Sequence, residues 1–155
     1  MVGRLTLERP VIEVASVYYS DAVTPAAMST SATPAQVDVF DLSDVSGGAF
    51  FEVITDGPGL VIRCLQAGRV EASAQLGRVV PPALSSVSAS IRVDTGSGYA
   101  DTATWMQSTE DGAATITGPA FAVSAGDKIA LFFAETGVGG STDFYQVALR
   151  AKRVR

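Results

Sequence analysis

Hydrophobic and polar residues alternate with a period of two along most of the chain. In residues 69–76 (RVEASAQL) every second residue is apolar, beginning at Val70, and the residues between are charged or polar. Residues 88–94 (SASIRVD) repeat this pattern, with apolar residues beginning at Ala89. A period of two places one set of side chains on each face of a strand. Each segment is therefore expected to form a half-buried β-strand.

Further segments of strand length are separated by turn-forming clusters such as SGG, DGPG, TGSG and EDG. No segment combines helical spacing of apolar residues with helix start and stop signals. Without crossover helices, evenly spaced strands favour antiparallel pairing. The chain is therefore predicted to be all-β, with about ten antiparallel strands arranged as a sandwich or a barrel. The expected strands are 11–18, 36–42, 49–55, 59–66, 69–76, 88–94, 99–107, 114–123, 127–135 and 143–152.

Residues 20–35 differ from the rest of the chain. They are small, mostly uncharged and interrupted by Pro25 and Pro34, so we expect them to supply no packed core element. An extended arm that contacts a neighbour and a flexible linker are both compatible with this composition. We therefore divide the chain into residues 1–35, an N-terminal strand and extended arm or connector, and residues 36–155, the sandwich domain.

Two expected strands, 59–66 and 127–135, are apolar on both faces. In a two-layer sandwich only the inner face of each sheet is covered by the other sheet, so an apolar outer face needs a further cover. Closed cyclic self-association would supply it. The alternative is that the N-terminal arm covers these strands. The residues predicted for a trimer interface are Val61, Leu65, Ala130, Phe132 and Ala134.

The composition excludes several kinds of active site. The 155 residues contain no histidine, which rules out imidazole as a base, an acid or a metal ligand, and the single Cys64 rules out an internal disulfide or a cysteine-rich zinc site. Carboxylates remain, such as Asp38 with Asp41 and Glu110 with Asp111, and the run of Asp38, Asp41 and Asp44 lacks the spacing of a calcium loop. We expect no catalytic residue, no metal and no cofactor, and hence no enzyme.

Charge is divided unevenly between the ends and the middle of the chain. Residues 1–9 and 150–155 together carry a net charge of +5, whereas residues 10–149 carry −10. An acidic body disfavours nucleic acid as a partner. No long apolar run suggests a membrane span or a signal peptide, so synthesis in a host cytoplasm is expected. The basic ends, with two nearby tyrosines, are predicted to dock on an acidic partner through Arg4, Arg9, Tyr18, Tyr19, Arg150, Lys152, Arg153 and Arg155.

Three segments resemble the jelly-roll heads of the complement and tumour-necrosis-factor superfamily: AGRVEASAQL at 67–76, VSAGDKIALFFAETG at 123–137 and STDFYQVALRAKRV at 141–154. The most specific part of the resemblance is Ala125-Gly126-Asp127 before an apolar strand. The chain departs from the family at Val70, where an aromatic residue is usual. The resemblance implies the fold, an all-β antiparallel β-sandwich (jelly roll) of about ten strands with adjacent N- and C-terminal strands, and a homotrimer.

Jelly-roll trimers of this kind also resemble accessory proteins on bacteriophage heads and fibres in size, acidity and small-residue content. The leading hypothesis is a virion structural protein, a decoration, cement or head-fibre protein. It would bind the capsid surface, through the major capsid protein or another virion protein, as a homotrimer. The alternative is the carbohydrate- or receptor-binding tip of a fibre or spike, with Tyr99 and Trp105 stacking on a cell-surface glycan.

Overall fold

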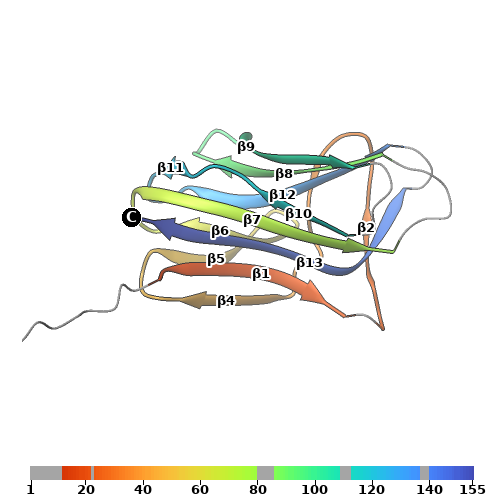
Figure 1. Ribbon diagram of the computed structural model, residues 1–155, viewed down its shortest axis with the longest axis horizontal. Coiled ribbons are helices and arrows are strands. Elements are labelled where there is room, and N and C mark those ends of the chain that lie inside the picture. Colours follow the sequence, from red (N-terminus) through yellow and green to blue (C-terminus); the bar gives the residue numbers. More distant parts are fainter. Residues whose placement is uncertain (1–11, 22, 80–85, 109–112, 137–139) are drawn as a thin grey trace, which may run out of the picture.

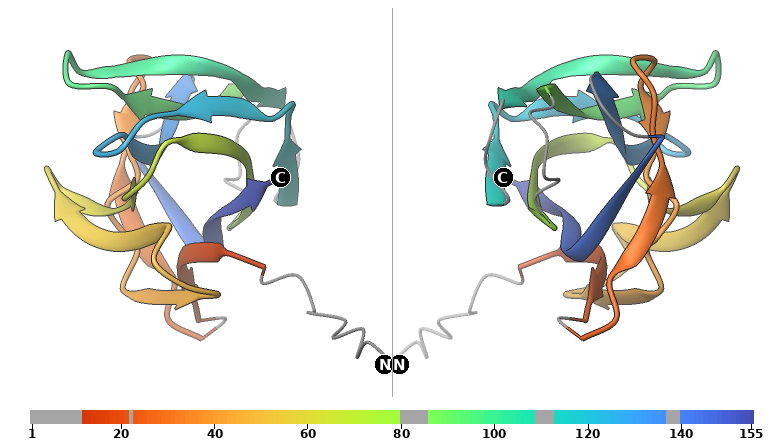
Figure 2. Two further views of the ribbon diagram at one scale, coloured as in Figure 1. Left: turned by 90° about the vertical axis from the view of Figure 1, so that its left-hand side faces the viewer. Right: turned by 90° about the vertical axis from the view of Figure 1, so that its right-hand side faces the viewer.

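The strands form two antiparallel sheets that pack face to face (Figure 1). This computed structural model describes residues 12–21, 23–79, 86–108, 113–136 and 140–155, and for residues 103–108 it describes the backbone alone. No helix occurs within these ranges. Viewed along its length in Figure 2, the molecule consists of two curved layers around a shared interior. The predicted antiparallel β-sandwich is confirmed.

The seven-stranded sheet contains both the first and the last described strand. Val14 of β1 lies opposite Lys152 of β13, and this pairing continues to Ser20 opposite Gln146. The expected adjacency of the terminal strands is therefore present. The order across the sheet is β10 (Ala113–Thr117), β7 (Gly68–Arg78), β13 (Ser141–Val154), β1 (Val14–Ser20) and β4 (Leu42–Ser46), with β11 (Phe121–Val123) beside β7 and β2 (Ala26–Ser29) beside β13.

The six-stranded sheet contains both strands predicted to be apolar on each face, β6 (Gly59–Cys64) and β12 (Lys128–Thr136). β12 pairs with β8 (Ser86–Asp94) over nine residue pairs, from Lys128 opposite Asp94 to Thr136 opposite Ser86. The order across this sheet is β5 (Phe51–Asp56), β6 (Gly59–Cys64), β12 (Lys128–Thr136), β8 (Ser86–Asp94) and β9 (Tyr99–Ser108), with β3 (Ala35–Gln36) also beside β12.

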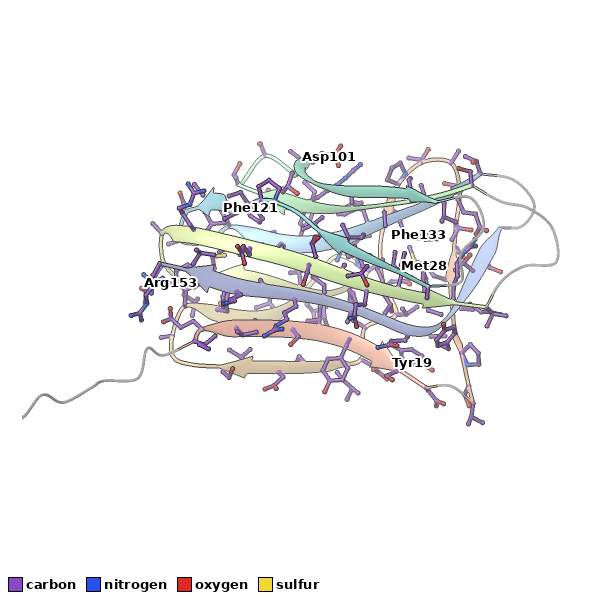
Figure 3. The ribbon with its side chains drawn as sticks, in the orientation of Figure 1. Tyr19, Met28, Asp101, Phe121, Phe133 and Arg153 are labelled. Atoms are coloured by element: carbon purple, nitrogen blue, oxygen red, sulfur yellow. The ribbon has the colours of Figure 1, made fainter. Side chains whose placement is uncertain are left out.

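The core lies between the sheets and contains the residues that alternation places inward. Phe133 of β12 meets Phe144 of β13 edge to face, with ring centroids 5.3 Å apart, which links the two sheets. Met28 of β2 is 2% exposed and belongs to the same core (Figure 3). The expectation that residues 20–35 supply no packed core element is therefore wrong. These residues include β2 and the first residue of β3, so this segment is part of the sandwich.

The expected strand at 36–42 is also wrong, because the chain changes sheets there. β3 belongs to the six-stranded sheet and β4 to the seven-stranded one, so residues 37–41 cross between them. Val37 and Phe40 are buried on this crossing. The apolar residues that suggested a strand thus fill the core from an irregular segment. This crossing, together with the short strands β2 and β11, accounts for thirteen described strands instead of about ten.

The turn before β12 explains why Gly126 is needed. Its φ of +94° lies in the region that side-chain-bearing residues rarely adopt. The Gly126 amide donates to the Cys64 carbonyl at 2.7 Å, and the Cys64 amide donates to the Asp127 carbonyl at 2.8 Å. The Asp127 carboxylate accepts the Ser124 amide at 2.8 Å. The turn therefore joins the start of β12 to the end of β6.

Candidate docking surface

The outer face of the seven-stranded sheet brings together some of the predicted docking residues. Because paired residues in neighbouring strands share a face, the register fixes which side chains lie in a row. One row runs from β1 to β10 through Tyr18, Ala148, Gln75 and Thr115. The next row contains Ser16, Arg150, Ser73 and Thr117, and the row after it contains Val14, Lys152 and Glu71.

Two adjoining hollows mark this face. The larger, about 320 Å³, lies over the rows of Tyr18 and Arg150, and the smaller, about 210 Å³, contains Arg150, Lys152 and Glu71. Arg150, Ser73 and Thr117 line both hollows, so the two are neighbours. Small side chains with hydroxyl groups leave this space above the sheet. We refer to Tyr18, Arg150, Lys152 and the residues that line these hollows as the docking face.

The docking face carries positive charge that is not neutralised by ion pairs. Arg150 and Lys152 are exposed, and neither takes part in an ion pair among the described residues. Glu71 lies opposite Lys152 in the register and is the acidic residue of the smaller hollow. Arg150, Lys152 and Glu71 together leave the lining of the hollows with one positive charge in excess on a chain whose net charge is −5, and exposed Asp44 of β4 lies opposite Ser16 at the edge of this face. Such a surface attracts an acidic partner, and its attraction is weakened by salt.

Other predicted docking residues lie elsewhere. Tyr19 lies partly buried against the core, on the opposite side of β1 from Tyr18, and its hydroxyl donates to the Thr24 carbonyl (Figure 3). Arg153 donates to Glu13 at 2.8 Å, and its guanidinium lies 4.5 Å from the centre of the Phe50 ring. Arg155 is exposed at the end of β13. Arg4 and Arg9 lie outside the described residues.

The residues predicted for the trimer interface lie on the six-stranded sheet. Val61, Ala130 and Ala134 are buried within the monomer, at 0%, 1% and 4% exposure. Leu65 is 39% exposed and Phe132 is half-buried. Only these two of the five therefore offer much surface to a second copy.

A cluster of polar and aromatic side chains lies over the same sheet. The Tyr99 hydroxyl donates to Asp56 at 2.7 Å, and Lys128 donates to Asp56 at 2.8 Å and lies 3.2 Å from Asp94. The Tyr99 ring lies 5.3 Å from that of Phe132. Because Tyr99 belongs to β9 and Asp56 to the end of β5, this bond joins residues of the two edge strands of the sheet. Part of the apolar outer face is thus covered from within the chain.

Hydrogen bonds within this cluster hold its charges in place. The bond from Lys128 is the main reason that the pKa of Asp56 lies below its ordinary value, and the bond from Tyr99 adds to it. Backbone amides of Gly96 and Gly98, at 2.8 and 2.9 Å, lower the pKa of Asp94. The hydrogen bonds that Lys128 makes to Asp56 and Asp94 raise the pKa of Lys128. The cluster is therefore fully charged at neutral pH, with Tyr99 protonated.

The pair predicted for glycan binding is only partly placed. The Tyr99 hydroxyl is bonded to Asp56, and its ring packs near Lys128 and Phe132, so part of this side chain is engaged within the chain. Trp105 lies opposite Ser90 in the register of β8 and β9, and its side chain is outside the described part of the structure. The register shifts between these two positions, so the simple six-residue spacing does not describe how the two are arranged.

The candidate carboxylates form no visible catalytic pair. Asp38 and Asp41 are exposed on the segment that crosses between the sheets. Glu110 and Asp111 fall outside the described residues. In the described part of the chain, no three His, Cys, Asp or Glu residues gather as a group able to hold a metal ion. A search of the same residues finds no helix long and apolar enough to span a membrane.

A buried ion pair was not anticipated from the sequence. Arg78 of β7 donates to Glu135 of β12 at 3.1 Å, with 3% and 4% of the two side chains exposed. Thr142 and Thr30 donate to the other oxygen of Glu135 at 2.5 and 3.1 Å. The sequence signal that could have revealed this pair is Glu135 itself, because a charged residue at a buried position of an apolar strand requires partners. This group ties both sheets and the end of β2 together.

Comparison with known proteins identifies the fold. No protein-family model and no curated protein sequence matches the chain. Among solved structures, the chain is similar to the Eiger TNF from S. frugiperda, with a TM-score of 0.59 and 12% sequence identity. The alignment covers 95% of this chain and 94% of that one. At this identity the likeness concerns the fold alone, and the chain has a jelly-roll fold like that of a TNF protein.

Proposed function

We propose that the protein is a non-enzymatic structural component of a phage-like virion that binds the capsid surface as a homotrimer. The observation that carries this proposal is the docking face, where Arg150 and Lys152 are exposed and outside the ion pairs of the described residues. Tyr18 adds an aromatic ring with a hydroxyl group beside them, a side chain that is common at protein interfaces. A basic face on an acidic chain would favour an acidic capsid surface.

The jelly-roll fold that this chain shares with a TNF protein supports self-association. Phe132 of β12 and Leu65, just after β6, keep accessible surface, and Leu42 and Val45 of the edge strand β4 are 47% and 40% exposed. A trimer would present the docking face three times, so individually weak contacts would combine into firm attachment. Sedimentation equilibrium at micromolar concentration tests this part. A monomer across the accessible concentration range would contradict it.

Attachment is tested on purified virions from the source of this sequence. Immunogold labelling with an antibody to the recombinant chain should place it on the capsid. Recombinant protein should then co-sediment with particles from which the native chain has been removed. The double variant Arg150→Ser/Lys152→Ser should bind at least tenfold less at low salt, and salt should weaken the wild type more than the variant.

The control variant is Arg153→Ser, because Arg153 is engaged by Glu13 and Phe50 and does not belong to the docking face. It should lose some stability and keep its binding. A truncation should remove residues 1–11 only, since β1 lies between β13 and β4 and its loss would disrupt the sheet. Equal binding by the wild type and the double variant at low salt would refute electrostatic docking.

A further inference from the structure

A hollow on the outer face of the six-stranded sheet has the features of a small ligand site. Its volume is about 390 Å³, within the range of small-molecule pockets. It lies over β8 and β12, on the side of the sandwich opposite the docking face. Its lining includes Pro34, Ser88, Ser90, Arg92, Asp101 and Phe132.

The hollow carries one positive and one negative side chain that already face each other. Arg92 Nε donates to Asp101 at 2.7 Å and to the Ser90 hydroxyl at 3.2 Å. Both of these bonds start from Nε, so in the described structure the two terminal nitrogens of the guanidinium remain for a ligand. The side chain of Arg92 is 20% exposed and is held by its bonds to Asp101 and Ser90. The side chain of Asp101, labelled in Figure 3, is 63% exposed. The site thus offers donors and an acceptor with no net charge.

The other wall of the hollow is apolar and rigid. The Arg92 guanidinium lies 4.7 Å from the centre of the Phe132 ring, and the Tyr99 ring supports Phe132 from 5.3 Å. Phe132 is half-buried and therefore keeps some exposed ring surface. Pro34, from the segment before β3, adds a second apolar surface. Because β8 and β12 are central strands of the sheet, these groups are held in place before a ligand arrives.

We propose that this hollow binds a neutral carbohydrate of one or two pyranose rings. Such a ligand has an apolar C–H face that fits Phe132 and Pro34, and adjacent hydroxyl groups that can accept from Arg92 and donate to Asp101. The hydroxyls of Ser88 and Ser90 extend the polar side. A sugar acid is disfavoured, since Asp101 would repel its carboxylate. The site does not depend on the docking face or on virion attachment.

The test uses a panel of methyl glucoside, methyl galactoside, methyl mannoside, maltose, lactose and glucuronic acid. Saturation-transfer NMR identifies any member that binds, and titration calorimetry measures its affinity. At least one neutral member should bind, and glucuronic acid should bind more weakly than the neutral sugars.

The variants Asp101→Asn and Arg92→Gln should each weaken that binding at least tenfold. The matched controls Asp143→Asn and Arg69→Gln change the same residue types on the seven-stranded sheet and should leave affinity within twofold of the wild type. If Arg92→Gln does not fold, Asp101→Asn decides, because that side chain is largely exposed. Absence of binding by every neutral probe, or wild-type affinity in Asp101→Asn, would overturn the proposal.

Discussion

The buried pair of Arg78 and Glu135 should contribute far more to stability than an exposed pair of the same kind. Glu135→Gln keeps the shape of the side chain but removes its charge, leaving the Arg78 guanidinium buried without this carboxylate. With its amide nitrogen toward Thr142 and Thr30, Gln can still donate to their hydroxyl oxygens and accept from Arg78 with its carbonyl, so the main loss is the charge opposite Arg78. Breaking one side of a buried pair costs about 3–5 kcal/mol.

The chain supplies a matched control. Glu52 pairs with Arg63 across neighbouring strands, but 34% and 41% of these side chains are exposed. An exposed pair contributes about 0–1 kcal/mol, since water and salt screen it. Glu52→Gln should therefore change stability by no more than about 1 kcal/mol. The two variants make the same chemical change and differ in burial.

Equilibrium unfolding in urea, followed by circular dichroism, measures both variants at equal protein concentration, because self-association would couple to stability. Glu135→Gln should lower the midpoint strongly with little change in the slope. In a thermal scan, the expected shift for a chain of this size is about 6–20 °C. Equal losses in the two variants, or a loss below about 1 kcal/mol for Glu135→Gln, would refute the reasoning from burial.

Three further predictions concern pH, a turn and the thiol. Because the pKa of Asp56 is lowered in the folded chain, its stabilising effect is present above the ordinary aspartate pKa and is lost as pH falls through the lowered value. The urea midpoint of Asp56→Asn should therefore fall less between pH 7 and pH 3 than that of the wild type. Parallel curves for the two proteins would contradict this. Gly126→Ala should lower the free energy of unfolding in urea by about 1–3 kcal/mol, because Gly126 has a positive φ. The control Gly140→Ala, whose added Cβ would meet no atom within 4 Å, should be nearly neutral. Equal effects of the two variants would remove the argument from backbone strain. Burial raises the pKa of the Cys64 thiol to about 12. A disulfide reagent at pH 8 should therefore label Cys64 in urea and not in the native protein. Rapid labelling of the native protein would show that the site opens.

Alternation in the sequence was sufficient to predict the fold class and much of the core. The inward positions of 69–76 and 88–94, from Val70 to Leu76 and from Ala89 to Val93, are buried as predicted. The same alternation could have separated the docking residues. Tyr18 and Tyr19 are adjacent in one strand and must point to opposite faces, and the same holds for Lys152 and Arg153.

The sequence by itself determined which side chains share a face of each strand, because that depends only on local backbone geometry. Tertiary structure decided which strands are neighbours, and therefore that residues 37–41 leave one sheet for the other. It also decided which side chains meet on the outer face of the six-stranded sheet and which meet between the sheets. Tyr99 reaches Asp56 across 43 positions of sequence, and Glu135 meets Thr30 across 105. Contacts so distant in the chain arise from strand order and register, which no local pattern encodes.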